Sequence, residues 1–489
     1  MAARSADGRA ADLLVIGGGV IGAGIARDAA LRGLSVVLAE QQDLASGTSS
    51  RPTRLIHGGL RYLEQFDFGL VRSDMREREI LLRIAPHLVR PLPFLLPMYD
   101  PGPLYRAKLR AGMYLYDLLS LDKSLPKRRW VSRAETIAAE PALDPRGLRG
   151  AWRFYDAQVP LIERLVVENA VDAAAHGAEV RTHTRVVGFI RDASGAVTGG
   201  RLRDELDGSE SEVRSRFTVN ATGPWLDLVN AHGLRPGRPP LLRLTKGVHL
   251  VVPRATRQAH VLFAKTDGRL FFVIPWLDYT IVGTTDTDYA GDPTAAAADA
   301  ADVRYLRTEA ARAFPDAPVD RVLYTWAGVR ALVRTDGVSA SRVSRKHALY
   351  DHRRDGAAGI LSVVGGKITA YRAIAEDVVD RVCQALDVTV RSSTDRELLP
   401  GARGGMPAPD PDLGPSAIAR AVRDEWARTV GDVLLRRSDA GLRAGQALER
   451  APDVADVMAG LLGWDRARRD REIARYAAEV APMRRFTQE

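Results

Sequence analysis

A strand–helix–strand pattern near the start of the chain limits its fold more than any other feature. Residues 13–16 form an apolar run typical of a buried parallel strand. An Ala-rich, helix-prone segment follows and ends at Gly33, where glycine can close a helix. A second apolar run covers 34–38. This order predicts two parallel strands joined by a helix, the basic unit of an open α/β sheet.

The turn between the first strand and the helix has the spacing of a dinucleotide-binding loop. Gly17, Gly19 and Gly22 follow G-x-G-x-x-G, and Glu40 ends the second strand. Gly17 permits a tight turn, Gly19 lets the backbone approach a pyrophosphate, and Gly22, with Gly24, lets the helix pack on the strand. Free N–H groups at the helix start attract phosphates, and Glu40 can accept hydrogen bonds from a ribose diol. The pattern indicates NAD or FAD.

Composition favours a cytosolic globular protein. The 489 residues are enough for two or three domains, and 46% hydrophobic with 27% charged residues is ordinary. Since no apolar run reaches 18 residues, we expect no transmembrane helix, and the first residues lack the apolar core of a signal peptide. Cys383 is the single cysteine, which excludes an internal disulfide and a cysteine-rich metal site. We expect no metal centre.

Positive charge is concentrated in residues 101–133. This basic segment has eight Lys or Arg against two Asp, interleaved with Tyr105, Tyr114, Tyr116 and Trp130. A solvated helical face with its aromatic residues in the core, an anionic membrane surface and nucleic acid each remain as interpretations. The sequence of the basic segment therefore does not decide among these three interpretations.

Lysine is rare enough for its position to carry information. The chain has 63 Arg and 7 Lys, so arginine is the usual cation. Lys246 lies in Thr-Lys-Gly-Val-His and Lys367 in Gly-Gly-Lys-Ile-Thr. A lysine beside glycine in such a chain suggests a site that requires a compact ammonium group.

The remaining strand and helix patterns predict a discontinuous cofactor domain. Strands expected at 179–184, 217–220 and 361–364 resemble those of a nucleotide-binding sheet, whereas 248–252, 270–275 and 279–284 form a β-rich insert. The Pro-rich 86–103 interrupts a helical pattern at 72–85, and helices are expected at 161–176, 296–314 and 369–386. The fold class is therefore α/β, with a doubly wound cofactor domain, an inserted β-rich substrate domain and a small C-terminal helical domain.

The expected boundaries follow from the same patterns. The cofactor domain comprises 10–64, 151–225 and 355–390; the substrate domain comprises 65–150 and 226–354; the C-terminal helical domain comprises 416–485. Since Gly365-Gly366-Lys367 brings the chain back to the cofactor late in the sequence, FAD, held along its whole length, fits better than NAD.

Several motifs together resemble the FAD-dependent glycerol-3-phosphate dehydrogenases, within the glycine-oxidase-like flavoproteins. The resemblance covers about residues 10–385. Its densest parts are 16–33, 47–50 with 55–64, and 365–372, with further similarity at 220–225, 246–249, 283–286 and 328–330. It implies oxidation of sn-glycerol 3-phosphate to dihydroxyacetone phosphate, with hydride transfer from C2 to flavin N5 and electrons passed to a membrane quinone.

The resemblance also implies roles for particular residues. Arg61, Tyr62 and Lys367 would hold the substrate phosphate, with Arg345 as a further cation, and Arg330 would stabilise charge on the C2 oxygen. His249 is the candidate base; His57 is the alternative base and otherwise packs beside the flavin. The residues expected to contact FAD are Gly17, Gly19, Val20, Ile21, Gly22, Glu40, Ser49, Ser50, His57, Gly58, Val186, Ala221, Thr222, Gly223, Thr284, Gly366, Lys367, Ile368 and Thr369.

Other interpretations stay open. Ser49 and Ser50 could simply cap the loop, Thr284 and Asp286 could be turn residues, and Arg345 could belong to a solvated charge run. A FAD enzyme acting on an amine or a 2-hydroxy acid is the second hypothesis, and a FAD-bearing nucleic-acid-binding protein is the third. The pocket cations favour a phosphate substrate, and we expect no nucleic-acid partner. A location at the inner face of the cell membrane and a homodimer are compatible with the resemblance.

Overall fold

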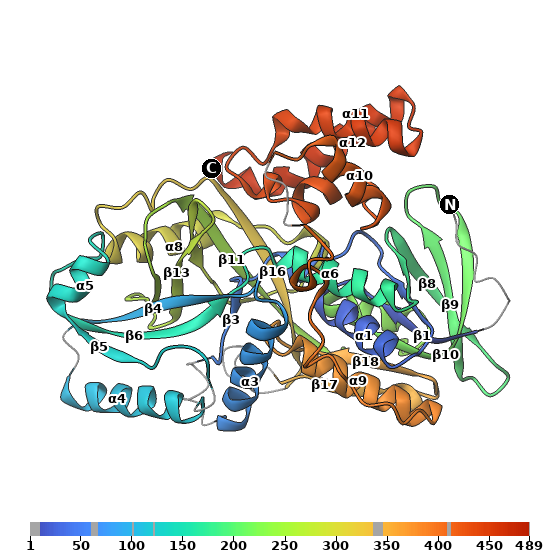
Figure 1. Ribbon diagram of the computed structural model, residues 1–489, viewed down its shortest axis with the longest axis horizontal. Coiled ribbons are helices and arrows are strands. Elements are labelled where there is room, and N and C mark those ends of the chain that lie inside the picture. Colours follow the sequence, from blue (N-terminus) through green and yellow to red (C-terminus); the bar gives the residue numbers. More distant parts are fainter. Residues whose placement is uncertain are drawn as a thin grey trace.

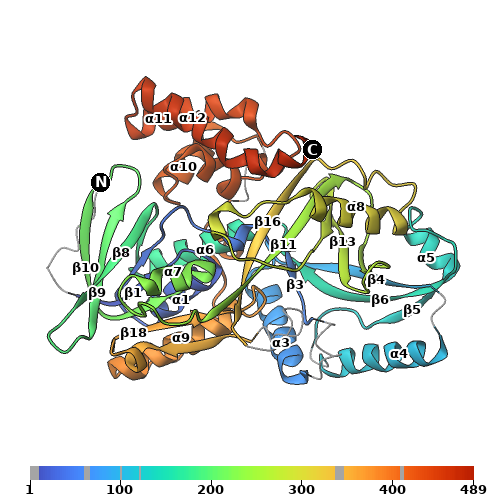
Figure 2. The same cartoon turned by 180° about the vertical axis from the view of Figure 1, so that it is seen from behind.

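The structure is a computed structural model that describes residues 10–59, 67–99, 102–120, 123–335, 346–407 and 412–488. Two large sheets lie side by side, and a group of helices from the C-terminal part of the chain covers one end of both (Figure 1). The same helices lie above both sheets when the molecule is seen from behind (Figure 2). The predicted fold class is confirmed.

The first sheet contains the predicted strand–helix–strand unit. Its spatial order is β17 (Ala348–Asp351), β18 (Ile360–Val364), β10 (Glu210–Asn220), β1 (Ala11–Ile16), β2 (Val36–Ala39) and β7 (Glu179–Arg181). The pairs from β18 to β7 are parallel, and β17 is antiparallel to β18. The long β10 also leaves the parallel sheet to pair with β9 (Val197–Asp204), which pairs with β8 (Thr184–Arg191).

Three helices pack together beside the parallel strands: α1 (Val20–Leu31), α6 (Ile162–Ala175) and α9 (Tyr371–Leu386). They share one large core with β1 and β2. Gly24 was expected to let α1 approach the strand. Instead, a Cβ at Gly24 would lie 2.9 Å from the ring of Tyr371, so this glycine permits the close contact between α1 and α9. The first turn of α9 therefore lies directly beside the glycine-loop helix.

The second sheet is mainly antiparallel. Its order is β15 (Thr287–Asp288), β11 (Leu242–Pro253), β14 (Tyr279–Gly283), β13 (Leu270–Trp276), β12 (Ala259–Phe263), β4 (Arg90–Tyr99), β6 (Leu148–Gln158) and β3 (Leu55–Ile56). β16 (Tyr324–Val333) also pairs with β11, and β5 (Arg129–Ser132) with β6. The sequence-based domain boundaries stay predictions; β6 crosses the one placed at residue 151.

The Pro-rich segment was wrongly expected only to break the pattern, because it forms the ten-residue strand β4. Pro91, Pro93 and Pro97 are separated by even numbers of residues, so their nitrogens face the same edge of the strand. The strand pairs with β6 along its length but with β12 only at Phe94 and Leu95. The missing N–H groups are tolerated because one edge of β4 forms few ladder bonds.

The other helices differ from the predicted ranges mainly at their ends. The helix expected at 72–85 is α3 (Phe68–Ile84), and the one expected at 296–314 is α8 (Ala300–Ala313), which starts at the Asp299 capping box. The remaining helices are α4 (Pro103–Leu118), α5 (Arg133–Ala139), α7 (Leu226–Ala231), α10 (Pro415–Arg423), α11 (Ala451–Leu462) and α12 (Arg466–Val480). Within the described ranges, none is both long and apolar enough to cross a membrane.

The C-terminal helices share a core with the second sheet. Residues of α10, α11 and α12 pack with Trp276, Tyr324 and Trp326 from β13 and β16. A short π-helical turn, Asp432–Arg437, precedes α11, and a 3-10 segment, Ala481–Gln488, follows α12. This packing places the end of the chain next to β16, which also forms part of the functional site.

Candidate active site

A long cavity begins at the carboxyl ends of the parallel strands and continues to the second sheet. Gly17 follows β1, Glu40 follows β2 and Ala221 follows β10, and all three line the cavity. At the other end its wall includes Phe272 of β13 and Arg330 of β16. In an open α/β sheet, ligands bind at this edge because the loops after parallel strands converge there.

The cavity gathers most of the residues predicted to bind cofactor or substrate. Those that line it are Gly17, Gly19, Val20, Ile21, Glu40, Ser49, His57, Val186, Ala221, Thr222, Gly223, His249, Thr284, Arg330, Gly366, Lys367, Ile368 and Thr369. Gly22, Ser50 and Gly58 are not among the lining residues. Arg61, Tyr62 and Arg345 lie outside the described residues, so their predicted roles stay predictions.

The glycine loop is shaped by close backbone contacts. Gly17 has φ of 108°, and a Cβ there would lie 2.7 Å from the carbonyl oxygen of Ala221. A Cβ at Gly22 would lie 1.8 Å from the carbonyl oxygen of Gly17. Gly19 is the N-cap residue of α1, and its cap has no side-chain hydrogen bond. The loop therefore presents backbone and the positive end of α1 to the cavity, as a pyrophosphate requires.

Glu40 is held in place for a ribose by the same loop. Its carboxylate accepts hydrogen bonds from the N–H groups of Gly18 at 2.6 Å and Gln42 at 2.9 Å. Burial raises the pKa of Glu40 above its usual range, although these bonds oppose the shift. Val186 and Thr222 line the cavity on neighbouring elements. This end thus has a carboxylate acceptor for the ribose in the adenosine half of FAD.

The two serines after the glycine loop differ in position. Ser49 lines the cavity, and its Oγ accepts a hydrogen bond of 3.0 Å from the N–H of Val20 in the first turn of α1. Ser50 donates to the carbonyl oxygen of Gly47 at 3.1 Å. Ser49 therefore supports the phosphate-facing helix end, whereas Ser50 stabilises its own turn, as in the loop-capping alternative.

Arg330 lies across the surface of β11. Its Nη2 donates to Thr284 Oγ1 at 2.9 Å, and its Nη1 lies 3.2 Å from Asp286 Oδ1. A Cβ at Gly247 would lie 2.1 Å from Nη2. Only a glycine at position 247 leaves room for the guanidinium. Thr284 and Asp286 therefore orient the guanidinium of Arg330, so their role goes beyond that of turn residues.

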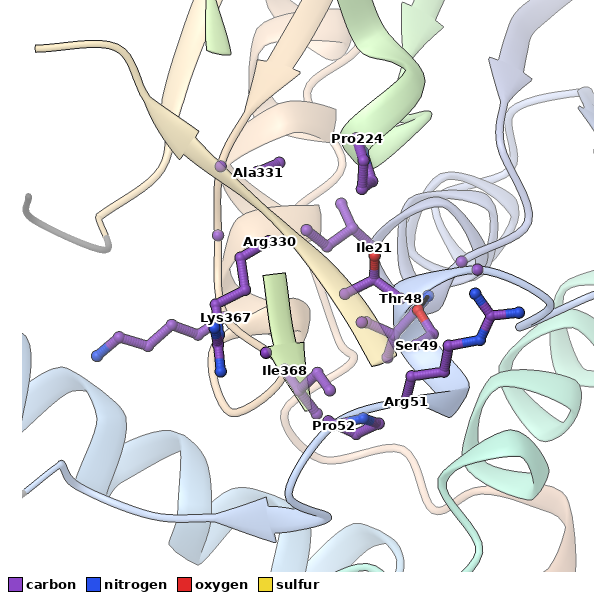
Figure 3. A pocket seen from close by; sticks show the side chains of 18 of the residues that line it. Ile21, Thr48, Ser49, Arg51, Pro52, Pro224, Arg330, Ala331, Lys367 and Ile368 are labelled. Atoms are coloured by element: carbon purple, nitrogen blue, oxygen red, sulfur yellow. Dashed lines mark hydrogen bonds between the residues drawn. The ribbon is translucent and has the colours of Figure 1, made fainter. Parts of the chain in front are cut away.

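Lys367 reaches from the late glycine loop toward α3. Figure 3 shows its ammonium end pointing away from Ile368, and Nζ lies 2.5 Å from Asp74 Oδ2. Burial raises the pKa of Asp74 to about 6, against the attraction of Lys367. In the same loop, Thr369 Oγ1 accepts a hydrogen bond of 3.2 Å from the N–H of His57. This bond joins the loop to the segment after β3.

His249 is a neutral, fully enclosed imidazole beside Arg330. Burial lowers its pKa well below the ordinary value, and the charges of Arg330 and Arg54 lower it further. Nε2 forms a 2.9 Å hydrogen bond with Thr53 Oγ1, and the ring packs on Trp326 with centroids 5.5 Å apart. Nδ1 is buried and has no hydrogen-bond partner in the described part of the chain. A neutral imidazole has one ring nitrogen without a proton, which can act as an acceptor.

The other predicted histidine lies against an aromatic ring. His57 lines the cavity, with its ring centroid 6.2 Å from that of Phe272 in an edge contact. Gly58 behind it permits close packing, because a Cβ there would lie 2.8 Å from Met75 and 2.9 Å from the hydroxyl of Tyr116. This environment suits a group that packs beside a flavin.

Lys246, in one of the two lysine motifs, is not among the residues that line the cavity. Lys246 pairs with Asp299 at 2.8 Å and Asp302 at 2.7 Å, at the start of α8. Adjacent residues of a strand face opposite sides, so Lys246 cannot share the face of Gly247. The ammonium group of Lys246 stabilises the packing of α8. The rarity of lysine in this chain therefore did not distinguish a structural lysine from one that faces the cavity.

Sequence reasoning missed several residues of the cavity wall. Arg269 lines it and donates to the carbonyl oxygen of Asp286 at 3.1 Å, so it lies next to Arg330. Arg54 forms a two-pronged ion pair with Glu163 at 2.9 and 2.8 Å and lies over the ring of Trp276. No motif signals these arginines, because the positions of their side chains depend on tertiary contacts.

Comparisons with known proteins agree with this geometry. The FAD dependent oxidoreductase family matches residues 12–372, and the C-terminal domain of alpha-glycerophosphate oxidase matches residues 382–469. A glycerol-3-phosphate dehydrogenase from Synechocystis sp. is 43% identical, over 76% of this chain and 69% of that protein. Glycerol-3-phosphate dehydrogenase 2 of Mycobacterium bovis is 38% identical, over 96% of this chain and 88% of that protein.

A solved structure extends the similarity to the whole fold. The glycerol-3-phosphate dehydrogenase of Bacillus halodurans, complexed with FAD, matches with a TM-score of 0.78 and 27% identity, over 97% of this chain and 95% of that chain. The glycine cradle and Glu40 fit the pyrophosphate and ribose of this cofactor. The cofactor of this enzyme is FAD, and the chain belongs to the FAD-dependent glycerol-3-phosphate dehydrogenase family.

Proposed function

We propose that this protein oxidises sn-glycerol 3-phosphate to dihydroxyacetone phosphate and passes the electrons to a quinone. The observation that carries the proposal is a set of three cations that line the cavity: Arg269, Arg330 and Lys367. A phosphate dianion needs more than one cation, whereas one arginine often suffices for a carboxylate. Arg61, Tyr62 and Arg345 stay predicted as further phosphate ligands.

Four side chains bind the substrate or act on its C2 hydroxyl group. Lys367 and Arg269 bind the phosphate, and Arg330 donates to the C2 oxygen as negative charge develops on it. His249 Nδ1 takes the hydroxyl proton, for which its lowered pKa keeps the imidazole in the neutral form. His57 remains the alternative base. When bound, FAD supplies the hydride acceptor for the C2 hydrogen at its N5.

Anaerobic reduction of the purified flavoprotein tests the substrate. Addition of sn-glycerol 3-phosphate should bleach the flavin absorbance in a stopped-flow instrument, and dihydroxyacetone phosphate should accumulate in equal amount. Glycine, proline and lactate serve as carboxylate-bearing comparisons. If one of them bleaches the flavin and glycerol 3-phosphate does not, the amine or 2-hydroxy acid hypothesis replaces this one.

The electron acceptor is tested with the same preparation. A soluble short-chain quinone should reoxidise the reduced flavin much faster than air-saturated buffer does, with little hydrogen peroxide. Rapid peroxide formation equal to substrate consumption would instead identify an oxidase.

We further propose that α4 rests on an anionic membrane surface. Its exposed apolar residues include Leu104, 84% exposed, and Leu118, 59% exposed, next to exposed Arg106 and Arg110. Met113 and Tyr116 are buried on its inner face, so the aromatic residues of the basic segment divide between core and surface. In both views α4 lies at the edge of the molecule opposite the C-terminal helices (Figures 1 and 2). Apolar and basic side chains together favour anionic lipid.

Liposome flotation tests this surface. The protein should float with vesicles containing phosphatidylglycerol at low salt, and the Leu104→Ser/Leu118→Ser variant should remain at the bottom. Leu228→Ser, at another exposed leucine on α7, is the matched control. Equal flotation of all three would remove α4 as the lipid contact. The proposed peripheral location at the inner membrane face rests on this lipid contact. The predicted homodimer is a separate proposal, which light scattering tests.

A further inference from the structure

A second cavity lies between the FAD cavity and the C-terminal helices. Its volume is about 470 Å³, and its wall combines loops of both sheets with α12 and the 3-10 segment after it. Arg51 and Trp225 line both cavities, so the two share a wall. This second cavity is separate from the substrate cations described above, because Arg269, Arg330 and Lys367 do not line it.

The acidic groups of the second cavity already have cationic partners. Asp43 accepts from Arg436 at 2.6 Å and from Arg437 at 2.7 and 2.8 Å. Asp432 bonds Arg436 at 2.8 Å and His183 Nε2 at 2.9 Å. Glu479, the third carboxylate on this wall, accepts from Arg436 at 2.8 Å. Each of the three carboxylates thus has a cationic partner within the protein, which reduces the negative potential in the cavity.

Three donor groups on the same wall lack an acceptor in the described part of the chain. The guanidinium of Arg51 forms no hydrogen bond or ion pair there. His183 Nδ1 and Trp326 Nε1 are buried and without a partner, in residues that are 2% and 4% exposed. His183 Nδ1 and Trp326 Nε1 are thus two unsatisfied buried nitrogens in residues of this wall, and the half-buried Arg51 adds a cation beside them, so the cavity lacks an acceptor for these groups among the described residues.

Charge at this cavity favours an anion as that acceptor. Burial disfavours protonation of His183, but attraction to Asp432 outweighs it and raises the pKa of His183, so both ring nitrogens can carry a proton. Burial lowers the pKa of Arg51, and the charge of Glu479 opposes this shift. Arg475 and Arg485 add exposed cations at the same wall.

We infer that the second cavity binds a phosphate-bearing small molecule through Arg51, His183 and Trp326. A guanidinium, an imidazolium and an indole N–H supply donors from three elements, which matches the several acceptor oxygens of a phosphate group. Arg51 points away from Arg330 and Lys367 in Figure 3, so this phosphate is a different one from that of the proposed substrate.

The occupant would contact groups that border the active site. Trp326 packs on His249, with ring centroids 5.5 Å apart. The backbone of Arg51 lies close to Gly328, where a Cβ would be 3.0 Å from its carbonyl oxygen. Gly328 is two residues before Arg330 on β16. A ligand in the second cavity is therefore linked to Arg330 through a short series of packed residues.

The test uses FAD-loaded protein and inorganic phosphate in titration calorimetry. Wild type should bind two phosphates, one at each cavity. Lys367→Gln should remove the first and keep the second. Arg51→Gln should weaken the second about tenfold or more, as expected for loss of a charge-assisted pair. A tungstate soak of crystals should place an anomalous peak beside Arg51.

Two further variants distinguish a loss of phosphate binding from misfolding. Arg475→Gln/Arg485→Gln changes only exposed residues and should also weaken the second phosphate, whereas Arg471→Gln, exposed on the same helix α12, should not. Flavin content and melting temperature report folding. A single phosphate that Lys367→Gln abolishes, or FAD itself occupying Arg51 in the crystal, would overturn this inference and leave the proposed function intact.

Discussion

The two ends of the FAD cavity are built in different ways. The glycine-loop end uses backbone and small residues from one continuous segment, with contacts such as the 1.8 Å approach that a Cβ at Gly22 would make. The substrate end uses long charged side chains from the residue before β13, from β16 and from the loop after β18. One end therefore depends on steric fit, and the other depends on charge placed by tertiary packing. Substitutions at the two ends should have different consequences.

The largest effect should come from Gly22→Ala. The added methyl group collides with the carbonyl oxygen of Gly17, so α1 and the loop cannot both keep their positions. We expect protein without FAD or failure to fold, measured as the flavin-to-protein absorbance ratio. Gly460→Ala in α11 meets nothing within 4 Å and should retain full flavin. Normal flavin content in Gly22→Ala would contradict the steric account of this end.

Arg330→Lys should reduce kcat about 10²- to 10³-fold with normal FAD content, because one donor stabilising a developing oxyanion is worth that much. An ammonium cannot reproduce the bonds to Thr284 and Asp286. Steady-state kinetics with an artificial dye measure the effect. Gly247→Ala is the companion variant, because it keeps the charge but displaces the guanidinium. A full rate in both would exclude Arg330 from catalysis.

His249→Gln should lower kcat about 10²-fold, the usual contribution of a general base. Because the pKa of His249 lies well below 6.5, wild-type kcat at saturating substrate should stay level as pH falls from 7 through 6. Saturation avoids the ionisation of the substrate phosphate. A loss of rate near pH 6.5 that disappears in His57→Gln would transfer the role of base to His57.

Asp74→Asn should change how stability depends on pH. The folded pKa of Asp74 is about 6 and the ordinary value is 3.8, so the folded state binds the extra proton between these values. Wild type therefore loses stability as pH rises from about 4 to about 6. The variant should gain up to about 3 kcal/mol relative to wild type over this interval. Urea unfolding at several pH values measures it, with exposed Asp278→Asn as control.

The smallest effect is expected for Ser50→Ala. It removes one turn hydrogen bond to Gly47, worth about 1 kcal/mol, and should leave FAD affinity unchanged. Ser49→Ala, which removes the acceptor for Val20 N–H, should weaken FAD binding several-fold. Reconstitution of apoprotein with FAD compares the two. Equal affinities would mean that both serines serve only the loop.

Sequence reasoning succeeded where the signal is local. The strand–helix–strand unit, its glycines and Glu40 occur within 30 residues, and Gly17, Gly22 and Glu40 each make a close backbone contact. It failed at β4, where prolines indicated a break but the pairing partners tolerate them. It also missed Arg269, which contacts Asp286 17 residues later, and Arg54, whose partner Glu163 lies 109 residues later in the chain.

By itself, the sequence determined that this protein holds a dinucleotide along a parallel sheet and that FAD suits the late return at Gly366 and Lys367. Only the tertiary structure decided which charged residues face the flavin end, that His249 is enclosed and neutral, and that Lys367 meets Asp74. The reason is physical. A glycine loop acts through its own backbone, whereas the pKa and direction of a side chain depend on neighbours that distant strands and helices supply.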